Sequence, residues 1–150
     1  MNIYGYCRIS TAKQSIDRQI RNIKAEYPTA HIVQEAYTGT SIFRPEWLKL
    51  YRVLKAGDTV EFDSVSRMSR NAEEGFALYE DLYHKGIRLV FLKEHYIDTE
   101  TYKKALSGSI AMTGTNVDFI LKGINEYLMA LAKEQIKLAF EQSEKEVADL

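Results

Sequence analysis

Two clusters of residues in this chain are suited to phosphate chemistry. Arg8 and Ser10 lie at the end of a short apolar stretch near the start of the chain, and Arg67 and Arg70 lie within residues 66–71 (SRMSRN). A serine oxygen can act as a nucleophile, and guanidinium groups match the oxygens of a phosphate in a bidentate way. One serine and three arginines suit a protein core poorly, whereas they suit the attack on a phosphodiester well.

Each cluster also has a plainer structural interpretation. Ser10 fits a helix N-cap, the most frequent role of a serine between a strand and a helix. Arg8 precedes it by two residues and so points to the same face of the strand, and an arginine on a strand that enters the core needs a partner. Arg67 and Arg70 are three residues apart, which aligns them on a helical turn; a solvated basic face is the alternative for that pair.

Other polar residues near these clusters are less informative. Arg44 lies in a polar stretch, where it could be either a lid residue or a surface charge. Gln14 and Gln19 are expected at the surface unless they orient a phosphate. Glu35 ends a predicted strand, where it could form a salt bridge with one of the arginines.

Several other kinds of site find no support in the sequence. The three histidines show no metal-ligand spacing, and the single cysteine has no partner. There is no GxGxxG or Walker A motif, and no motif places a histidine for a Ser-His-Asp arrangement. We therefore expect neither a metal site nor a nucleotide site.

Strands and helices alternate along the first 92 residues. The apolar runs predict strands at residues 2–8, 31–35, 59–62 and 87–92. Between them the helical spacing of apolar residues predicts three helices. The first follows Ser15 with Ile16, Ile20 and Ile23; the second begins at Pro45 with Trp47, Leu48, Tyr51 and Leu54; the third covers residues 72–84.

This alternation predicts an α/β fold with a largely parallel sheet. Sites in such folds gather beyond the carboxyl ends of the strands. Ser10 lies just past the first strand and residues 66–70 lie just past the third. We therefore expect the two clusters to lie close together.

The last third of the chain predicts one long helix. Residues 93–115 are less regular, but residues 116–150 hold no proline and one glycine, which predicts a helix of about 30 residues. Its apolar residues follow a heptad-like pattern that we expect to meet another subunit, and the final residues still read as helix, which suggests a truncation. These apolar residues are Val117, Leu121, Ile124, Leu128, Leu131 and Leu138, with Gln135 in the gap.

Composition bounds the class of protein. The 150 residues, 45% of them hydrophobic, suit one globular domain with or without an appendage. No apolar run is long enough to cross a membrane, no secretory signal is recognisable, and one cysteine fits a cytoplasmic protein. The net charge of −1 is unusual for a nucleic-acid binder, but all eight arginines lie at or before Arg88.

Taken together, these motifs resemble the catalytic signature of the serine recombinases, the resolvase/invertase family. The resemblance begins with residues 5–11 (GYCRIST) and continues through Gln14, Gln19, Glu35 and Gly39. It then takes in Arg44, residues 66–71 and the long helix, and so covers essentially the whole chain. Each motif is weak alone, but the combination is specific.

The resemblance implies a mechanism and a fold. Ser10 would attack a phosphodiester of double-stranded DNA and form a 5′-phosphoserine bond, without a metal or another cofactor. Arg8, Arg67 and Arg70 would be the central phosphate ligands, with Arg44 as a further contact. Tyr6, Gln14 and Gln19 would support the site. The implied fold is a largely parallel sheet of four to five strands flanked by helices, followed by a long oligomerisation helix.

The resemblance also implies an organisation and partners. Residues 1–115 would form the catalytic domain, and residues 116–150 the oligomerisation helix, before a DNA-binding part that this chain does not contain. The protein would form dimers and, on paired DNA sites, tetramers in a prokaryotic cytoplasm. It would come from a mobile element.

Two positions depart from the family pattern, and two other functions stay open. Ser66 stands where the family usually has Asp, and Glu35 where members often have Asp. The first departure raises the alternative of a non-catalytic, dimerising, DNA-associated regulator with the same fold. A small α/β phosphatase is another alternative, which the heptad-like pattern of the long helix argues against.

Overall fold

The computed structural model describes the backbone of residues 1–9, 16–36, 44–110 and 117–148, and the side chains of residues 1–9, 16–36, 44–104 and 123–142. Ser10, Gln14, Ser15, Gly39 and the stretch 37–43 lie outside the described residues. The elements are β1 (Ile3–Arg8), α1 (Ile16–Glu26), β2 (His31–Glu35), α2 (Pro45–Val53), β3 (Thr59–Phe62), η1 (Val65–Arg67), α3 (Ala72–His84), β4 (Arg88–Phe91), η2 (His95–Ile97), α4 (Thr99–Ile110) and α5 (Val117–Ala148).

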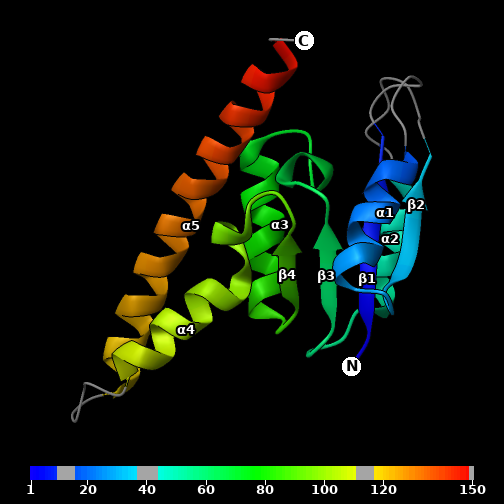
Figure 1. The fold of residues 1–150 in the computed structure, drawn as a ribbon. Helices are drawn as coiled ribbons and strands as arrows, with labels where there is room; N and C mark the ends of the chain where they lie inside the picture. The colour runs from blue at the N-terminus through cyan, green and yellow to red at the C-terminus, as the bar shows by residue number, and fades with distance from the viewer. Residues whose placement is uncertain (10–15, 37–43, 111–116, 149–150) are drawn as a thin grey trace.

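The strands form one parallel sheet, as predicted. Within the described ranges it has four strands in the order β2-β1-β3-β4, and every neighbouring pair is parallel. Because all four strands run the same way, their carboxyl ends share one edge (Figure 1). Arg8 and Glu35 lie at this edge as paired last residues of β1 and β2, and residues 63–70 begin there, beyond β3.

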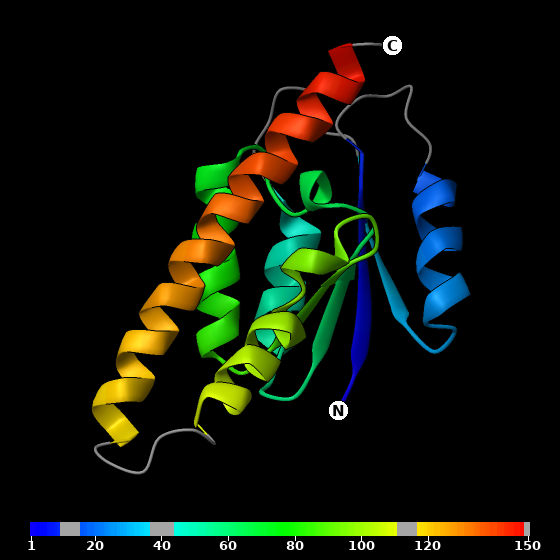
Figure 2. The ribbon, with the colours of Figure 1, turned by 60° about the vertical axis from the view of Figure 1, so that its left-hand side comes forward.

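Helices cover both faces of the sheet. Helix α1 lies on one face, where Cys7, Ile23 and Ala30 are fully or almost fully buried. Helices α2 and α3 lie on the other face, and α5 packs beyond them against α3 and α4 (Figure 2). The sheet is therefore buried on both sides, the usual state of a parallel sheet.

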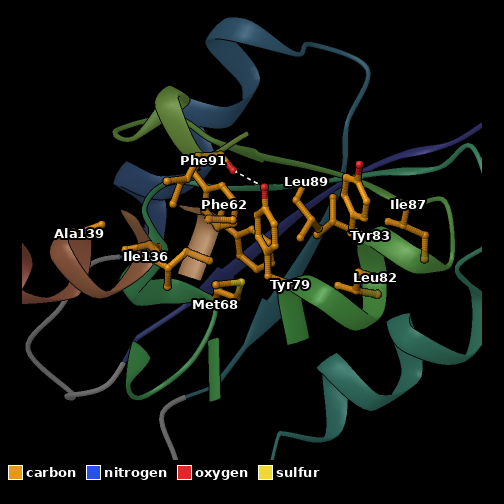
Figure 3. Close-up of a cluster of buried hydrophobic side chains, with 14 of the residues drawn as sticks. Phe62, Met68, Tyr79, Leu82, Tyr83, Ile87, Leu89, Phe91, Ile136 and Ala139 are labelled. Atoms are coloured by element: carbon orange, nitrogen blue, oxygen red, sulfur yellow. Dashed lines mark hydrogen bonds between the residues drawn. The ribbon is translucent and has the colours of Figure 1, made fainter. Parts of the chain in front are cut away.

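The larger core lies between the sheet and helices α2, α3 and α5. Phe62 and Phe91 stack with their ring centroids 5.3 Å apart, and Tyr79 of α3 stacks on Phe91 at 6.2 Å. Figure 3 shows Ile136 and Ala139 of α5 at the side of this aromatic cluster. The long helix thus belongs to the same hydrophobic core as the sheet.

The predicted heptad-like stripe of the long helix is only partly right. Its extent is confirmed, because α5 has 32 residues. However, Leu128 is buried against the chain's own core, whereas Leu131 and Leu138 are 39% and 47% exposed. The buried face consists of Leu128, Met129, Ala132, Ile136, Ala139 and Phe140. A straight α-helix has 3.6 residues per turn, whereas a heptad pattern repeats every 3.5 residues. Residues spaced as a heptad therefore drift around the helix, and the face that packs on the chain's own core includes residues outside the predicted stripe.

Two further expectations are wrong. Leu48 is 46% exposed, and Leu50 takes its place beside Trp47 on the buried face of α2. The spacing explains this, since residues three and four apart share a helix face whereas adjacent residues do not. Residues 93–115 were expected to be less regular than the rest, but residues 99–110 form helix α4. Its Tyr102 is buried in the larger core, so tertiary packing has overridden a weak local pattern.

A buried carboxyl group lies on the α1 side of the sheet. Glu61 of β3 is fully buried opposite Gly5 of β1. Neither of its carboxylate oxygens has a hydrogen-bond partner in the part of the chain that the structure describes. Burial, together with the nearby charge of Glu26, raises the pKa of Glu61 to about 8.

Candidate active site

At the carboxyl edge of the sheet, Arg8 of the first predicted cluster lies beside residues 66–69 of the second. Arg8 Nη2 donates to the carbonyl oxygens of Ser66 (2.7 Å) and Ser69 (3.2 Å), and Arg8 Nε donates to that of Arg67 (3.2 Å). The guanidinium therefore ties the end of β1 to the segment that follows β3. Ser10, two residues after Arg8 in the sequence, lies outside the described residues.

Gln19 is buried, which corrects its expected position at the surface. Its side chain, only 2% exposed, reaches from α1 to the end of β1. There Oε1 accepts from the backbone N–H of Arg8 (3.0 Å), and Nε2 donates to the carbonyl of Arg8 (2.8 Å). Because the carboxamide meets both backbone groups, it fixes the position at which Arg8 leaves the sheet.

Arg67 and Arg70 do not share a face, contrary to the prediction. Residues 65–67 form a short 3₁₀ helix, η1, which turns Arg67 inward, so that its Nε is buried. Arg70 is 55% exposed at its side chain and pairs with Glu74 in the first turn of α3 (Nη2 to Oε1, 2.7 Å). That hydrogen bond raises the pKa of the Arg70 guanidinium.

Asp63 is a charged neighbour of Arg67 that the sequence reasoning missed. Burial lowers the pKa of Arg67, and the negative charge of Asp63 partly opposes this effect. Asp63 is itself 2% exposed. Its Oδ1 accepts from Asn22 Nδ2 (2.8 Å), and its Oδ2 lies 3.5 Å from Lys93 Nζ. The signal was available, because a carboxylate directly after a buried parallel strand falls at the site edge.

Ser66, the departure from the family pattern, lies within a hydrogen-bonded turn. Its Oγ is 2.7 Å from the Oγ of Ser64. The buried carboxylate of Glu94 accepts from the backbone N–H of Val65 at 3.0 Å. Glu94 thus holds the start of η1 from beyond β4, and the sequence had shown no role for it.

Arg44 reaches the site from the N-terminus of α2. Its Nη1 donates to the carbonyl of Met68 (2.8 Å), and its Nε donates to the hydroxyl of Tyr6 (3.1 Å). The guanidinium also lies over the rings of Tyr6 and Trp47, with its Cζ at 5.0 and 5.5 Å from their centroids. Arg44 is therefore held inward as part of the site, rather than as a surface charge.

Glu35 acts on Arg44 through Tyr6. Its carboxylate is 2% exposed, and Oε2 accepts from the Tyr6 hydroxyl at 3.0 Å. The expected salt bridge to an arginine is thus replaced by a relay in which the Tyr6 hydroxyl lies between the carboxylate and the guanidinium of Arg44. Burial is the main cause that raises the pKa of Tyr6, to about 12, so the phenol remains protonated and can donate to Glu35.

Two cations face each other at this edge. Burial lowers the pKa of Arg8, and the nearby positive charge of Arg44 lowers it further. A guanidinium group keeps its positive charge in proteins, so both side chains are cations. A cluster of partly buried positive charges favours the binding of a phosphate anion. No group of three His, Cys, Asp or Glu side chains suited to a metal ion occurs within the described residues.

The described helices include none that is long and apolar enough to cross a membrane.

Comparison with known proteins agrees with this architecture. A family model described as the resolvase N-terminal domain matches residues 3–146. A resolvase from Clostridium perfringens is 32% identical over 99 residues, which are 65% of this chain and 52% of that protein. The transposon Tn21 resolvase from Escherichia coli is 27% identical over 134 residues, 87% of this chain and 70% of that protein. The match thus spans about half the length of the first relative and more of the second.

Solved structures show the same fold. The N-terminal catalytic domain of TP901-1 integrase superimposes with a TM-score of 0.58 at 28% identity, over 87% of this chain and 98% of that one. A resolvase-family site-specific recombinase from Streptococcus pneumoniae, 19% identical, superimposes with a TM-score of 0.51 over 100% of this chain and 99% of that one, a likeness of fold alone. Since the family model covers nearly all of the sequence, the chain belongs to the resolvase family.

Proposed function

We propose that this chain is the catalytic part of a site-specific DNA recombinase that cuts and rejoins double-stranded DNA. The observation that carries the proposal is the bonding of Arg8, two residues before Ser10, to the carbonyls of residues 66–69. This contact holds the end of β1, two residues before Ser10 in the sequence, beside the arginine-rich segment. Partly buried guanidinium groups at the edge of a parallel sheet suit the binding of a phosphodiester.

In the proposed reaction, the Ser10 hydroxyl attacks a phosphorus atom of the DNA backbone. The serine Oγ–P bond forms and the bond from phosphorus to the 3′ oxygen breaks, which leaves a 5′-phosphoserine and a free 3′ hydroxyl. The proton lost by the serine is balanced by the proton gained by the 3′ oxygen. The reverse reaction with a new 3′ hydroxyl rejoins the strands, so the covalent bond conserves the energy of the phosphodiester.

The arginines supply electrostatic stabilisation in this scheme. The attack builds up negative charge on the phosphate oxygens, and preorganised donors stabilise such charge most when they are already fixed. Arg8 and Arg44 are fixed by carbonyls of the chain, and Arg67 is partly buried at the same edge. Arg70 is exposed, so we assign it to the phosphate only after a rearrangement on DNA. Tyr6, Gln14, Gln19, Glu35 and Ser66 support the site in this proposal.

We further infer that α5 joins two copies of the chain into a dimer, and that dimers pair into a tetramer on two DNA sites. Tyr127, Leu131 and Leu138 are exposed on the described part of α5. Their spacing of four and seven residues places them along one side of the helix. An exposed apolar row of this kind fits a second apolar helix. In this organisation residues 1–115 form the catalytic domain and residues 116–150 form the oligomerisation helix, although residues of both parts pack in one core.

The test is a covalent trap. The full product of the gene would react with DNA from around the gene, and denaturant would stop the reaction. We expect wild-type protein on 5′ DNA ends and no such adduct for Ser10→Ala, while Ser107→Ala, a matched serine change on α4, behaves as wild type. Specific binding without an adduct, from folded wild-type protein, would favour the non-catalytic regulator instead.

A further inference from the structure

Helix α2 begins with an unusual residue. Arg44 occupies its N-cap position, and its side chain makes no capping hydrogen bond. Arginine is not among the residues favoured there, and a positive charge is unfavourable beside the positive end of a helix dipole. A local conflict of this kind needs compensation elsewhere and often marks a functional position.

Glu35 supplies the compensation from the end of β2. Its Oε2 accepts from the backbone N–H of Trp47 at 3.0 Å, and its Oε1 lies 3.4 Å from that of Glu46. Pro45, the first helical residue, has no N–H to satisfy. A carboxylate from another element thus takes over the task of the N-cap side chain and adds a favourable negative charge at this helix end.

The same carboxylate also fixes Tyr6. The Tyr6 hydroxyl donates to Glu35 Oε2 and accepts from Arg44 Nε. Since a hydroxyl has one proton, its donation to Glu35 turns a lone pair toward the arginine. Arg44 Nη1 is bound to the Met68 carbonyl, while Nη2 is buried and has no hydrogen-bond partner among the residues that the structure describes.

We propose that Glu35 and Tyr6 are positioning residues for Arg44: Glu35 caps α2 so that position 44 can hold an arginine, and Tyr6 binds Nε so that the N–H groups of Nη2 and the second N–H of Nη1 are left for the substrate phosphate. The reach of the carboxylate is part of this arrangement. It serves the Tyr6 hydroxyl and the N-terminal turn of α2 together. Only the assignment of a phosphate as the ligand rests on the proposed function. The hydrogen bond by which Tyr6 fixes Arg44, which we call the lock, does not depend on that function.

The experiment compares Tyr6→Phe with Tyr51→Phe. Tyr6→Phe keeps the ring beneath the guanidinium and removes the acceptor for Nε. Tyr51 provides the matched control, because its hydroxyl also donates to a carboxylate (Asp81 Oδ2, 2.7 Å) and lies on α2 away from the site. Glu35→Gln is the second variant. Both carboxylate oxygens of Glu35 accept hydrogen bonds, whereas glutamine replaces one of them with an NH₂ donor, which would face either a backbone N–H of α2 or the Tyr6 hydroxyl.

Two readouts separate the lock from the chemistry. The first is the Nε–H NMR signal of Arg44 in the protein without DNA, assigned by its loss in Arg44→Lys. We expect this signal to shift and to exchange faster with water in Tyr6→Phe and Glu35→Gln, and to be unchanged in Tyr51→Phe. The second is the rate of covalent adduct formation, which should fall about 10- to 100-fold in the two site variants through misplacement of Arg44, with much smaller changes in DNA affinity and melting temperature.

The outcomes are distinct. An unchanged Arg44 signal in Tyr6→Phe would overturn the lock. A changed signal with an unchanged adduct rate would overturn the positioning role. Wild-type protein that forms no adduct would overturn the proposed function, while the signal would still decide whether the lock exists.

Discussion

Gln19 and Arg8 are joined by two hydrogen bonds that use both ends of a buried carboxamide. Gln19 Oε1 accepts from the N–H of Arg8, and Nε2 donates to its carbonyl, at 3.0 and 2.8 Å. Arg8 pairs with Glu35 of β2 but lies beyond the β1–β3 register, which ends at Tyr6 and Phe62, and there Gln19 supplies partners for its backbone groups. Buried backbone groups need such partners.

Gln19→Glu should therefore destabilise the protein. A carboxylate has no N–H for the Arg8 carbonyl, so one hydrogen bond is lost and two oxygens face each other in a buried place. We expect a loss of about 1–3 kcal/mol in the free energy of unfolding, measured by urea denaturation near pH 7. Gln34→Glu makes the same change at an exposed position of β2 and should change stability by less than about 0.5 kcal/mol. Equal effects at both positions would contradict the assigned role of Gln19.

Asp63→Asn should slow DNA cleavage more than it affects folding. The amide can still accept from Asn22, but the negative charge that favours the Arg67 cation is lost. We expect the rate of adduct formation to fall about 10-fold or more through poorer placement of Arg67. Lys93→Ala is the control, since it removes the ion pair of Lys93 with Asp63 and leaves the carboxylate in place. A Lys93→Ala variant as slow as Asp63→Asn would assign the effect to the ion pair instead.

Glu61 should make stability depend on pH. The pKa of Glu61 is about 8 in the folded protein and about 4.5 when unfolded, so between these values the folded state binds more protons than the unfolded state. Stability therefore falls as pH rises through this window, with a slope approaching about 1.4 kcal/mol per pH unit, and levels off above pH 8. Glu61→Gln should lose this slope in chemical denaturation at pH 5 to 8. A parallel pH profile for wild type and Glu61→Gln would show that the carboxyl ionises freely.

Ile136→Ala should reveal that α5 belongs to the folded core. Ile136 is fully buried, whereas Leu138 on the same helix is 47% exposed. Truncating a buried isoleucine typically costs about 2–5 kcal/mol, and Leu138→Ala should change the free energy of unfolding by less than about 0.5 kcal/mol. Both variants are compared by denaturant titration at a concentration low enough to keep the chain monomeric. A small effect of Ile136→Ala would mean that α5 docks only weakly.

The order of the elements and the meeting of Arg8 with residues 66–69 could be predicted from the sequence, because both follow from local patterns. Short apolar runs between helical repeats predict parallel strands, and parallel strands bring their carboxyl ends to one edge. Arg8 and residues 66–70 each follow such a run. The absence of proline after residue 115, the single glycine and the heptad-like spacing of apolar residues together predicted α5.

Only the tertiary structure decided which way the side chains point and what they bind. Gln19 is buried because it bonds both backbone groups of Arg8, Glu94 holds the start of η1 through the N–H of Val65, and Arg44 is held by Tyr6 and Met68. Each of these contacts joins residues that are far apart in the sequence. A polar side chain can be buried only where other groups satisfy its hydrogen bonds. The periodicity of apolar residues is a local property of the sequence, so it cannot identify partners that are distant in the chain.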